Sequence, residues 1–148
     1  MATNALSRNV RAADLARAFE LASRLVHSRS HAHGLYPAQW SALRYFTTAT
    51  GEHRTAVALA RYQGLAFGPV ARTVRTLIER GFLRKAGSAG RGRAEVVELT
   101  PTGERMLLQD PLAPLVLAIA DLDPRAQEGL AGALAPIVQA LAGNEPES

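Results

Sequence analysis

A mostly helical fold with one small β-hairpin is predicted by three features of the 148-residue sequence. Two short helical patterns flank Gly64, which suits the tight turn of a helix-turn-helix. Two strand-like runs follow, joined by a loop rich in glycine and arginine. Long apolar helical patterns occupy both ends of the chain. This order predicts a single domain (α+β) with a winged helix-turn-helix lobe at 35–100, terminal helices at 1–34 and 101–143 that can pair within one subunit or serve as dimerisation helices between two, and a frayed tail at 144–148.

The N-terminal pattern predicts one long helix over residues 5–28, ended by Gly34, with His31 and His33 in its last turn. Its apolar stripe needs a partner surface, within one subunit or between two. The members of that stripe are Leu15, Ala18, Phe19, Ala22, Leu25 and Val26. A second helix is expected from Pro37 to about Thr48, although Tyr36 stands where a capping side chain is usual.

The helix-turn-helix is predicted at about 55–63 and from Gly68-Pro69 to Arg80, with Gly81 as its C-terminal cap. Ala60 provides the small residue that the first helix needs where the second crosses it. The contacts between the two helices are expected from Leu59, Leu65, Val70, Val74 and Leu77. This arrangement turns Phe67, Gly68, Ala71, Arg72 and Arg75 toward a DNA groove. Phe67 either contacts a thymine methyl group or packs in the core, and the core is favoured.

Residues 82–85 and 94–99 are expected to be strands, joined by the loop 87–93. Thr100 and Pro101 begin a further helix, as a capping residue and a first-turn proline do. Asp110-Pro111 predicts a break, and Asp123-Pro124 begins a last helix that reaches about Ala142.

The charges are distributed unevenly along the chain. The net charge is +3 over residues 1–52, +8 over residues 53–93 and −7 over residues 94–148, which sums to +4. A basic middle segment indicates a polyanionic partner on one face of the molecule. Sixteen of the seventeen cations are arginine, the side chain best suited to bidentate contacts with phosphate and guanine.

Five segments resemble the MarR family of bacterial transcriptional regulators in order and spacing, within a similarity that covers about residues 10–140. They are 35–40, 59–60, 70–74, 77–81 and 99–103. The resemblance implies a homodimer in which interlocked terminal helices hold two winged helix-turn-helix lobes on double-stranded DNA. Most members repress transcription, and many release DNA on binding a small, often aromatic, effector. This chain departs from the family at Arg91, where the wing often has an acid, at residues 67–71, where small hydroxylated residues are usual, and at Tyr36, where a capping threonine is usual.

The DNA contacts follow from this pattern. Arg72 and Arg75, one turn apart, are the best candidates for guanine or phosphate contacts, and Thr73 and Thr76 are weaker ones. Arg91 and Arg93 are expected to reach a minor groove from the wing. The remaining predicted contacts, to phosphates or along the start of the recognition helix, are Arg54, Thr55, Arg61 and Gly68. Tyr36, Trp40, Tyr45 and Phe46 either line an effector pocket or form plain core, and the core is favoured.

Other classes of function have little support in the sequence. Neither a nucleophile elbow nor a Gly-x-x-x-x-Gly-Lys phosphate loop occurs, so we expect no enzyme and no cofactor. The sequence has no cysteine, no signal peptide and no apolar run long enough to span a membrane, as expected of a cytoplasmic protein. His27, His31 and His33 favour helix-end capping and solvent exposure over a metal site or a role in a ligand pocket. A sequence-tolerant architectural DNA binder and a basic protein-interaction module remain alternatives, and the operator, the regulated genes and the effector stay open.

Overall fold

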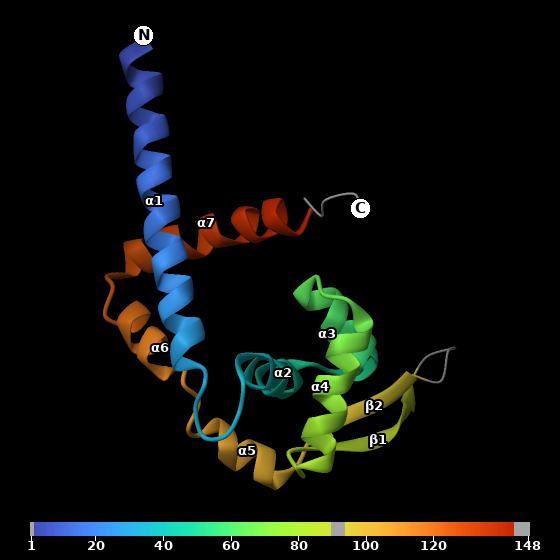
Figure 1. Cartoon of the computed structure of the whole chain (residues 1–148). Helices are drawn as coiled ribbons and strands as arrows, with labels where there is room; N and C mark the ends of the chain where they lie inside the picture. Colours follow the sequence, from blue (N-terminus) through green and yellow to red (C-terminus); the bar gives the residue numbers. More distant parts are fainter. Residues whose placement is uncertain (1, 90–93, 144–148) are drawn as a thin grey trace.

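The computed structural model describes residues 2–89 and 94–143, which form seven α-helices, one 3-10 turn and a two-stranded antiparallel sheet (Figure 1). The predicted mostly helical fold with a small hairpin is confirmed. None of the described helices combines the length and the apolar character that crossing a membrane requires. The elements are α1 (Ala2–Arg29), α2 (Pro37–Thr48), η1 (Gly51–His53), α3 (Ala56–Gln63), α4 (Phe67–Glu79), β1 (Leu83–Ala89), β2 (Ala94–Leu99), α5 (Pro101–Leu107), α6 (Ala113–Ala120) and α7 (Pro124–Ala142).

The hydrophobic core lies in the lobe formed by α2, α3, α4 and the hairpin. Apolar residues at helical spacing on α4, namely Val70, Val74 and Leu77, are buried there against the other elements. The largest completely enclosed side chains are Trp40, Leu43, Leu59, Leu77 and Leu83. Since these contacts bury one stripe of α4, they also decide which stripe of the same helix faces outward.

The turn of the helix-turn-helix forms as predicted, but two apolar side chains that were predicted to be buried are exposed. Gly64 has the left-handed backbone conformation (φ 63°), and Ala60 is buried beside it. The predicted packing of Leu65 is wrong, because this side chain is 57% exposed in the turn. The favoured core position of Phe67 is also wrong. Its side chain is 53% exposed because, in the first turn of α4, it lies at the wall of an open groove that α3 and the hairpin also line.

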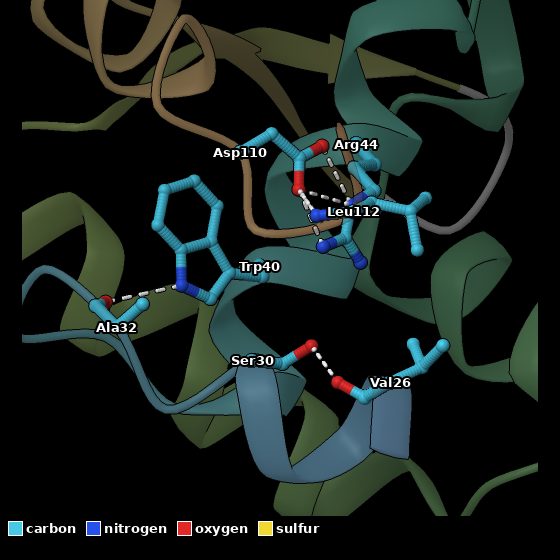
Figure 2. A network of polar contacts seen from close by, with 7 residues as sticks. All are labelled: Val26, Ser30, Ala32, Trp40, Arg44, Asp110 and Leu112. Atoms are coloured by element: carbon cyan, nitrogen blue, oxygen red, sulfur yellow. Dashed lines mark hydrogen bonds and ion pairs between the residues drawn. The ribbon is translucent and has the colours of Figure 1, made fainter. Parts of the chain in front are cut away.

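Helix α1 ends at Arg29, earlier than the predicted end at Gly34, so His31 and His33 lie outside it. The Ser30 hydroxyl donates to the Val26 carbonyl (2.8 Å) where the helix closes (Figure 2). Ala32 and Leu35 then exchange two backbone hydrogen bonds across His33 and Gly34, both at positive φ (54° and 75°). A tight two-residue turn therefore replaces the expected last turn of helix.

Helix α2 begins without a side chain from Tyr36 as its cap. Instead, the Tyr36 N–H donates to the side-chain carbonyl of Gln39 (2.8 Å), so the helix supplies a partner from its own first turn. The Trp40 indole N–H donates to the Ala32 carbonyl (3.2 Å), as Figure 2 shows. These two contacts fix the start of α2 against the turn at residues 32–35.

The hairpin is longer than predicted, because β1 continues to Ala89 through the start of the expected loop. Leu83 lies opposite Leu99, and Ala89 lies opposite Ala94. The register shifts by one residue between Lys85 and Ser88, and this bulge contains Gly87 at φ 106°. The rest of the predicted loop, residues 90–93, lies outside the described residues, as does the predicted frayed tail at 144–148.

An ion pair links the lobe to the C-terminal helices at the predicted break. The Arg44 guanidinium on α2 donates two hydrogen bonds to the Asp110 carboxylate, Nε to Oδ2 at 2.8 Å and Nη2 to Oδ1 at 2.6 Å (Figure 2). The backbone N–H of Leu112 donates to the same carboxylate (2.8 Å). Both side chains are largely buried, so this bidentate pair holds α5 and α6 at a set position relative to α2.

We expect the Asp110→Asn substitution to lower the free energy of unfolding by about 1–3 kcal/mol near neutral pH, because it breaks a charge-assisted hydrogen-bond pair. Partial burial by itself raises the pKa of the Asp110 carboxyl, but hydrogen bonds from Arg44 and Leu112 and the Arg44 charge bring that pKa below its ordinary value of 3.8. A carboxyl with a lowered folded-state pKa stabilises the fold above about pH 4 and loses this contribution as the pH falls further. Urea unfolding at pH 7 and pH 3 checks this: the gap between wild type and variant should shrink at pH 3. A gap that is equal at both pH values would contradict the role given to this pair.

Candidate nucleic-acid interface

The outward face of α4 carries two exposed arginines. Gly68, Arg72 and Arg75 are exposed on the side of the helix opposite the buried Val70, Val74 and Leu77. Within the part of the chain that the structure describes, neither Arg72 nor Arg75 forms an ion pair with a carboxylate. An unpaired guanidinium on an exposed helix face keeps all its donors available for a phosphate or a guanine edge.

The two threonines and the glycine of α4 contribute differently. The Thr73 hydroxyl donates to the Pro69 carbonyl one turn earlier (3.2 Å), and both Thr73 and Thr76 are half-buried. A Cβ added at Gly68 would meet no atom within 4 Å, so the fold does not need glycine there. Arginine therefore supplies the fully exposed polar side chains of this face, and Gly68 leaves open space beside them.

Two of the predicted phosphate contacts are engaged inside the lobe. Thr55 is buried, and its hydroxyl accepts from the Ala58 N–H (3.1 Å) to cap α3. Arg54 pairs with Glu98 of β2 (Nη1 to Oε2, 3.4 Å), and its carbonyl accepts from the Val97 N–H (2.7 Å). These contacts fasten the start of α3 to the hairpin. Arg61, in the last turn of α3, is exposed.

Most charged side chains in the described part of the hairpin form ion pairs with one another. The sequence analysis did not predict these pairs. Arg84 lies opposite Glu98 in the antiparallel register and pairs with it (2.6 Å), and Lys85 pairs with Glu95 (3.2 Å). Arg80 donates to the Gly34 carbonyl (2.9 Å). The alternation of opposite charges across the two predicted strands was the signal that could have found the Arg84 pair. Arg91 and Arg93, the predicted wing contacts, lie outside the described residues.

A groove of about 520 Å³ separates α4 from the hairpin. From α4 its wall is formed by Phe67, Ala71, Val74, Arg75, Ile78 and Glu79. The rest of the lining comes from α3 and the hairpin: Ala56, Val57, Lys85, Ala94, Glu95 and Val97. The sequence analysis did not predict this groove, because it depends on the distance between a helix and a hairpin that are joined only by a short turn.

The four predicted effector-pocket residues do not surround one cavity. Trp40 is completely buried and Phe46 is buried with it in the lobe core, so the core interpretation is correct for both. Tyr36 is exposed on the other side of the α2 start. Tyr45 lines a different hollow beside Tyr62 (ring centroids 5.2 Å apart), and its hydroxyl donates to the His53 carbonyl (2.7 Å). Burial, with a smaller contribution from Tyr62, raises the pKa of the Tyr45 hydroxyl.

A separate cavity of about 510 Å³ lies where α1 meets α2, α6 and α7. Its walls are mostly apolar, and its polar groups include the side chains of His27 and Arg44. The other lining residues are Phe19, Ala22, Ser23, Val26, Ser30, Pro37, Leu115, Ile119, Leu130 and Leu134. The apolar stripe of α1 was the only sequence signal for it, since the remaining walls come from α2 and, much further along the chain, from α6 and α7.

The histidines near the end of α1 pack with each other and with aromatic rings. The rings of His27 and His31 are 5.5 Å apart edge to face, and His33 lies similarly against Trp40 (6.3 Å). Within residues 2–89 and 94–143, no three metal-binding side chains are grouped closely enough to hold an ion.

Solved structures share this architecture. A MarR family transcription regulator superposes with a TM-score of 0.69 at 19% identity, over 97% of this chain and 98% of its own. MarR from Staphylococcus aureus, in complex with salicylate and kanamycin, gives a TM-score of 0.64 at 18% identity, over 95% of both chains. A variant of S. aureus MepR bound to an oligodeoxyribonucleotide gives 0.55 at 15% identity, over 87% of this chain and 96% of that one.

Sequence comparison alone yields less. No protein-family model and no curated protein matches the chain. The structural similarity nevertheless extends over nearly the whole chain, from α1 to α7, and includes the helix-turn-helix, the hairpin and the flanking helices. It confirms the resemblance found in the sequence: the chain has the fold of the MarR-family transcriptional regulators.

Proposed function

We propose that this protein is a homodimeric transcriptional regulator that binds a pseudo-palindromic operator in the cytoplasm and represses transcription by occluding a promoter. The observation that carries the proposal is the pair of exposed, unpaired arginines on the outward face of α4, Arg72 and Arg75. They lie on the second helix of a helix-turn-helix, the element that enters the major groove in proteins of this architecture. The oligodeoxyribonucleotide bound to MepR supports the same use of the fold.

The chemistry of the α4 face suits duplex DNA. Each guanidinium offers donors in a planar fork that matches either a phosphate or the O6 and N7 acceptors of guanine. One turn of separation lets one arginine contact a base while its neighbour contacts the backbone. Arg61 adds a cation on α3, where the first helix of such a motif crosses the backbone. Arg91 and Arg93 are proposed to extend the interface into a minor groove.

The helices outside the lobe supply the dimer interface. No residue of α6 or α7 is buried in the single chain, and neither is any of residues 11–29 in α1. Large apolar side chains are nevertheless exposed on all three helices: Leu15, Phe19, Leu21 and Leu25 on α1, Leu115, Val116 and Leu117 on α6, and Ile137, Val138 and Leu141 on α7. An apolar surface this extensive on neighbouring helices is typical of a subunit interface. A two-fold dimer would then present two lobes to half-sites roughly 34 Å apart.

The cavity between α1, α2, α6 and α7 is the proposed effector site, in place of the pocket predicted from the sequence. Its apolar walls fit an aromatic ring, and Arg44 and His27 fit an acidic substituent. The salicylate complex of MarR supports a ligand of this class. Because the cavity lies where the dimerisation helices meet the lobe, a ligand that binds one lobe spacing better than another would shift the dimer away from the DNA-bound arrangement.

The proposal is tested first by selecting bound fragments from the host genome and competing a selected duplex against random DNA. We expect the selected duplex to bind more than about 10³-fold more tightly than random DNA at physiological salt. A smaller ratio would favour a sequence-tolerant architectural protein. Failure to bind any duplex at low salt would favour a protein-interaction module.

Arg72→Ala and Arg75→Ala should each weaken binding of the selected duplex. If an arginine contacts a phosphate, its removal should flatten the plot of log K against log salt by about one unit. If it reads guanine, the variant should instead lose discrimination at that base pair by about 1–3 kcal/mol. Arg125→Ala on α7 is the matched control, an exposed arginine outside the lobe, and should change neither quantity. Unchanged slope and unchanged discrimination in both α4 variants would remove this face from the interface.

Phe19→Asp should shift the protein from dimer to monomer, because it places a charge in the proposed apolar interface. Analytical ultracentrifugation at micromolar concentration measures the state, and circular dichroism reports whether the lobe stays folded. Tyr62→Asp, also at an exposed aromatic residue but on α3, should remain dimeric. A wild-type protein that sediments as a monomer would contradict the interface.

Salicylate at millimolar concentration should weaken binding of the selected duplex by the wild type. Ala22→Trp, which fills the cavity from α1, should abolish this response while the affinity for DNA without salicylate stays close to that of the wild type, because Ala22 lies outside the lobe that carries α4. Fluorescence anisotropy of a labelled duplex measures both. An undiminished salicylate response in the variant would show that the effector binds elsewhere.

A further inference from the structure

The first turn of α4 presents an aromatic ring to solvent beside the unpaired arginines. Phe67 is the first residue of the helix, and its 53% exposure contrasts with Val70, Val74 and Leu77 of the same helix, which are buried. Its neighbours on the groove side are Ala71, one turn further, and Arg75, one turn beyond that. Phe67, Ala71 and Arg75 therefore form one stripe that runs from apolar to cationic along the helix.

The beginning of α4 offers no side chain that could hydrogen-bond a base. Its first three residues are Phe67, Gly68 and Pro69, and the next exposed polar side chain is Arg72. The hydroxyl of Thr73 already donates to the Pro69 carbonyl. A recognition helix makes its base contacts mainly through its N-terminal residues. A side-chain contact with a base at the first three residues of this helix is therefore apolar.

We propose that Phe67 is a specificity-determining residue that selects a thymine by packing on its C5-methyl group in the major groove of each half-site. This inference rests on the proposed function and adds the base that the start of the helix recognises. The thymine methyl is the one apolar feature that an unmodified base pair presents in the major groove, and it projects toward the protein. Packing on it covers a ring that water otherwise contacts.

Gly68 and Arg72 complete the geometry. Open space surrounds the Gly68 Cα, since an added Cβ would meet nothing within 4 Å, and the absence of a side chain lets the backbone of this turn approach the base edges. Arg72 lies one turn further along and extends to the next base pair or its phosphate. The half-site is thus read as a thymine adjacent to the position that Arg72 contacts.

The test replaces thymine by uracil, which removes only the methyl group and leaves base pairing unchanged. The selected duplex is synthesised with single dT→dU replacements, one position at a time and then at both symmetry-related positions. We expect one such thymine in each half-site. Replacing it in a single half-site should lower the affinity of the wild type about threefold to fivefold, the value for burying one methylene-sized group. Replacement in both half-sites should cost about tenfold or more, if the two half-sites contribute independently.

Phe67→Ala decides whether this residue senses the methyl group. The variant should bind the dT duplex more weakly than wild type but with a dT/dU affinity ratio near one at that position. Phe67→Leu, which keeps an apolar side chain, should restore a ratio above one. Tyr62→Ala is the matched control, a more exposed aromatic residue of the same motif that stacks on Tyr45, and should keep the wild-type ratio. Circular dichroism confirms that each variant is folded.

Three results would contradict the inference, and each points to a different explanation. A wild type that binds the selected duplex but responds to no single dT→dU replacement shows that no thymine methyl is read. A wild-type response that survives in Phe67→Ala assigns the methyl contact to another residue or to DNA shape. A wild type that binds no duplex at all refutes the proposed function, and this inference with it.

Discussion

The packing of α4 in the lobe core is the constraint on which the rest of the interface depends. Val70, Val74 and Leu77 are buried against α2, α3 and the hairpin, and this fixes the rotation of the helix about its own axis. With that rotation set, Arg72 and Arg75 face outward, and Phe67 projects over the groove toward the hairpin. Core packing of this kind tolerates little change in volume or rotation. The position of every side chain on the face proposed for DNA therefore follows from the contacts behind it.

The lobe and the remaining helices are stabilised in different ways. The lobe buries its apolar residues within one chain, whereas α1, α6 and α7 leave large apolar side chains exposed. The bidentate pair between Arg44 and Asp110 is the polar link between these two parts. Arg44 also lines the cavity between them. A ligand in that cavity would thus contact the same guanidinium that holds the lobe in position. In the proposed dimer, binding of the ligand would therefore act directly on the spacing between the two lobes.

The net charge of the basic segment overstates the number of cations available for the proposed contacts with DNA. The segment with net charge +8 contains Arg54, Arg84 and Lys85, which pair with acids of β2, and Arg80, which holds the turn at Gly34. These cations help to attach the hairpin and the turn to the lobe. In the described part of the chain, Arg61, Arg72 and Arg75 remain as the exposed cations of this segment that make neither an ion pair nor a side-chain hydrogen bond. Affinity for DNA would therefore rest on fewer groups than the composition indicates, and base recognition on a largely apolar start of α4.

Much of the fold was predictable because its signals are local. The left-handed turn at Gly64, the capping by Thr100 and Asp123, and the periodicity of Val70, Val74 and Leu77 each depend on a few neighbouring residues. The outward face of α4, and with it Arg72 and Arg75, followed from that periodicity. The resemblance of short motifs to one family added the order in which these elements assemble.

The sequence by itself determined which elements form and which stripe of α4 is apolar, since helix periodicity and turn preferences act over a few residues. Only the tertiary structure decided that Arg54 pairs with Glu98, that Phe67 and Leu65 are exposed, and that the cavity lies against α1 and not around Trp40. Most of these outcomes depend on contacts between segments distant in the chain. Such contacts are governed by how whole faces fit together, and no local pattern of residues encodes that fit.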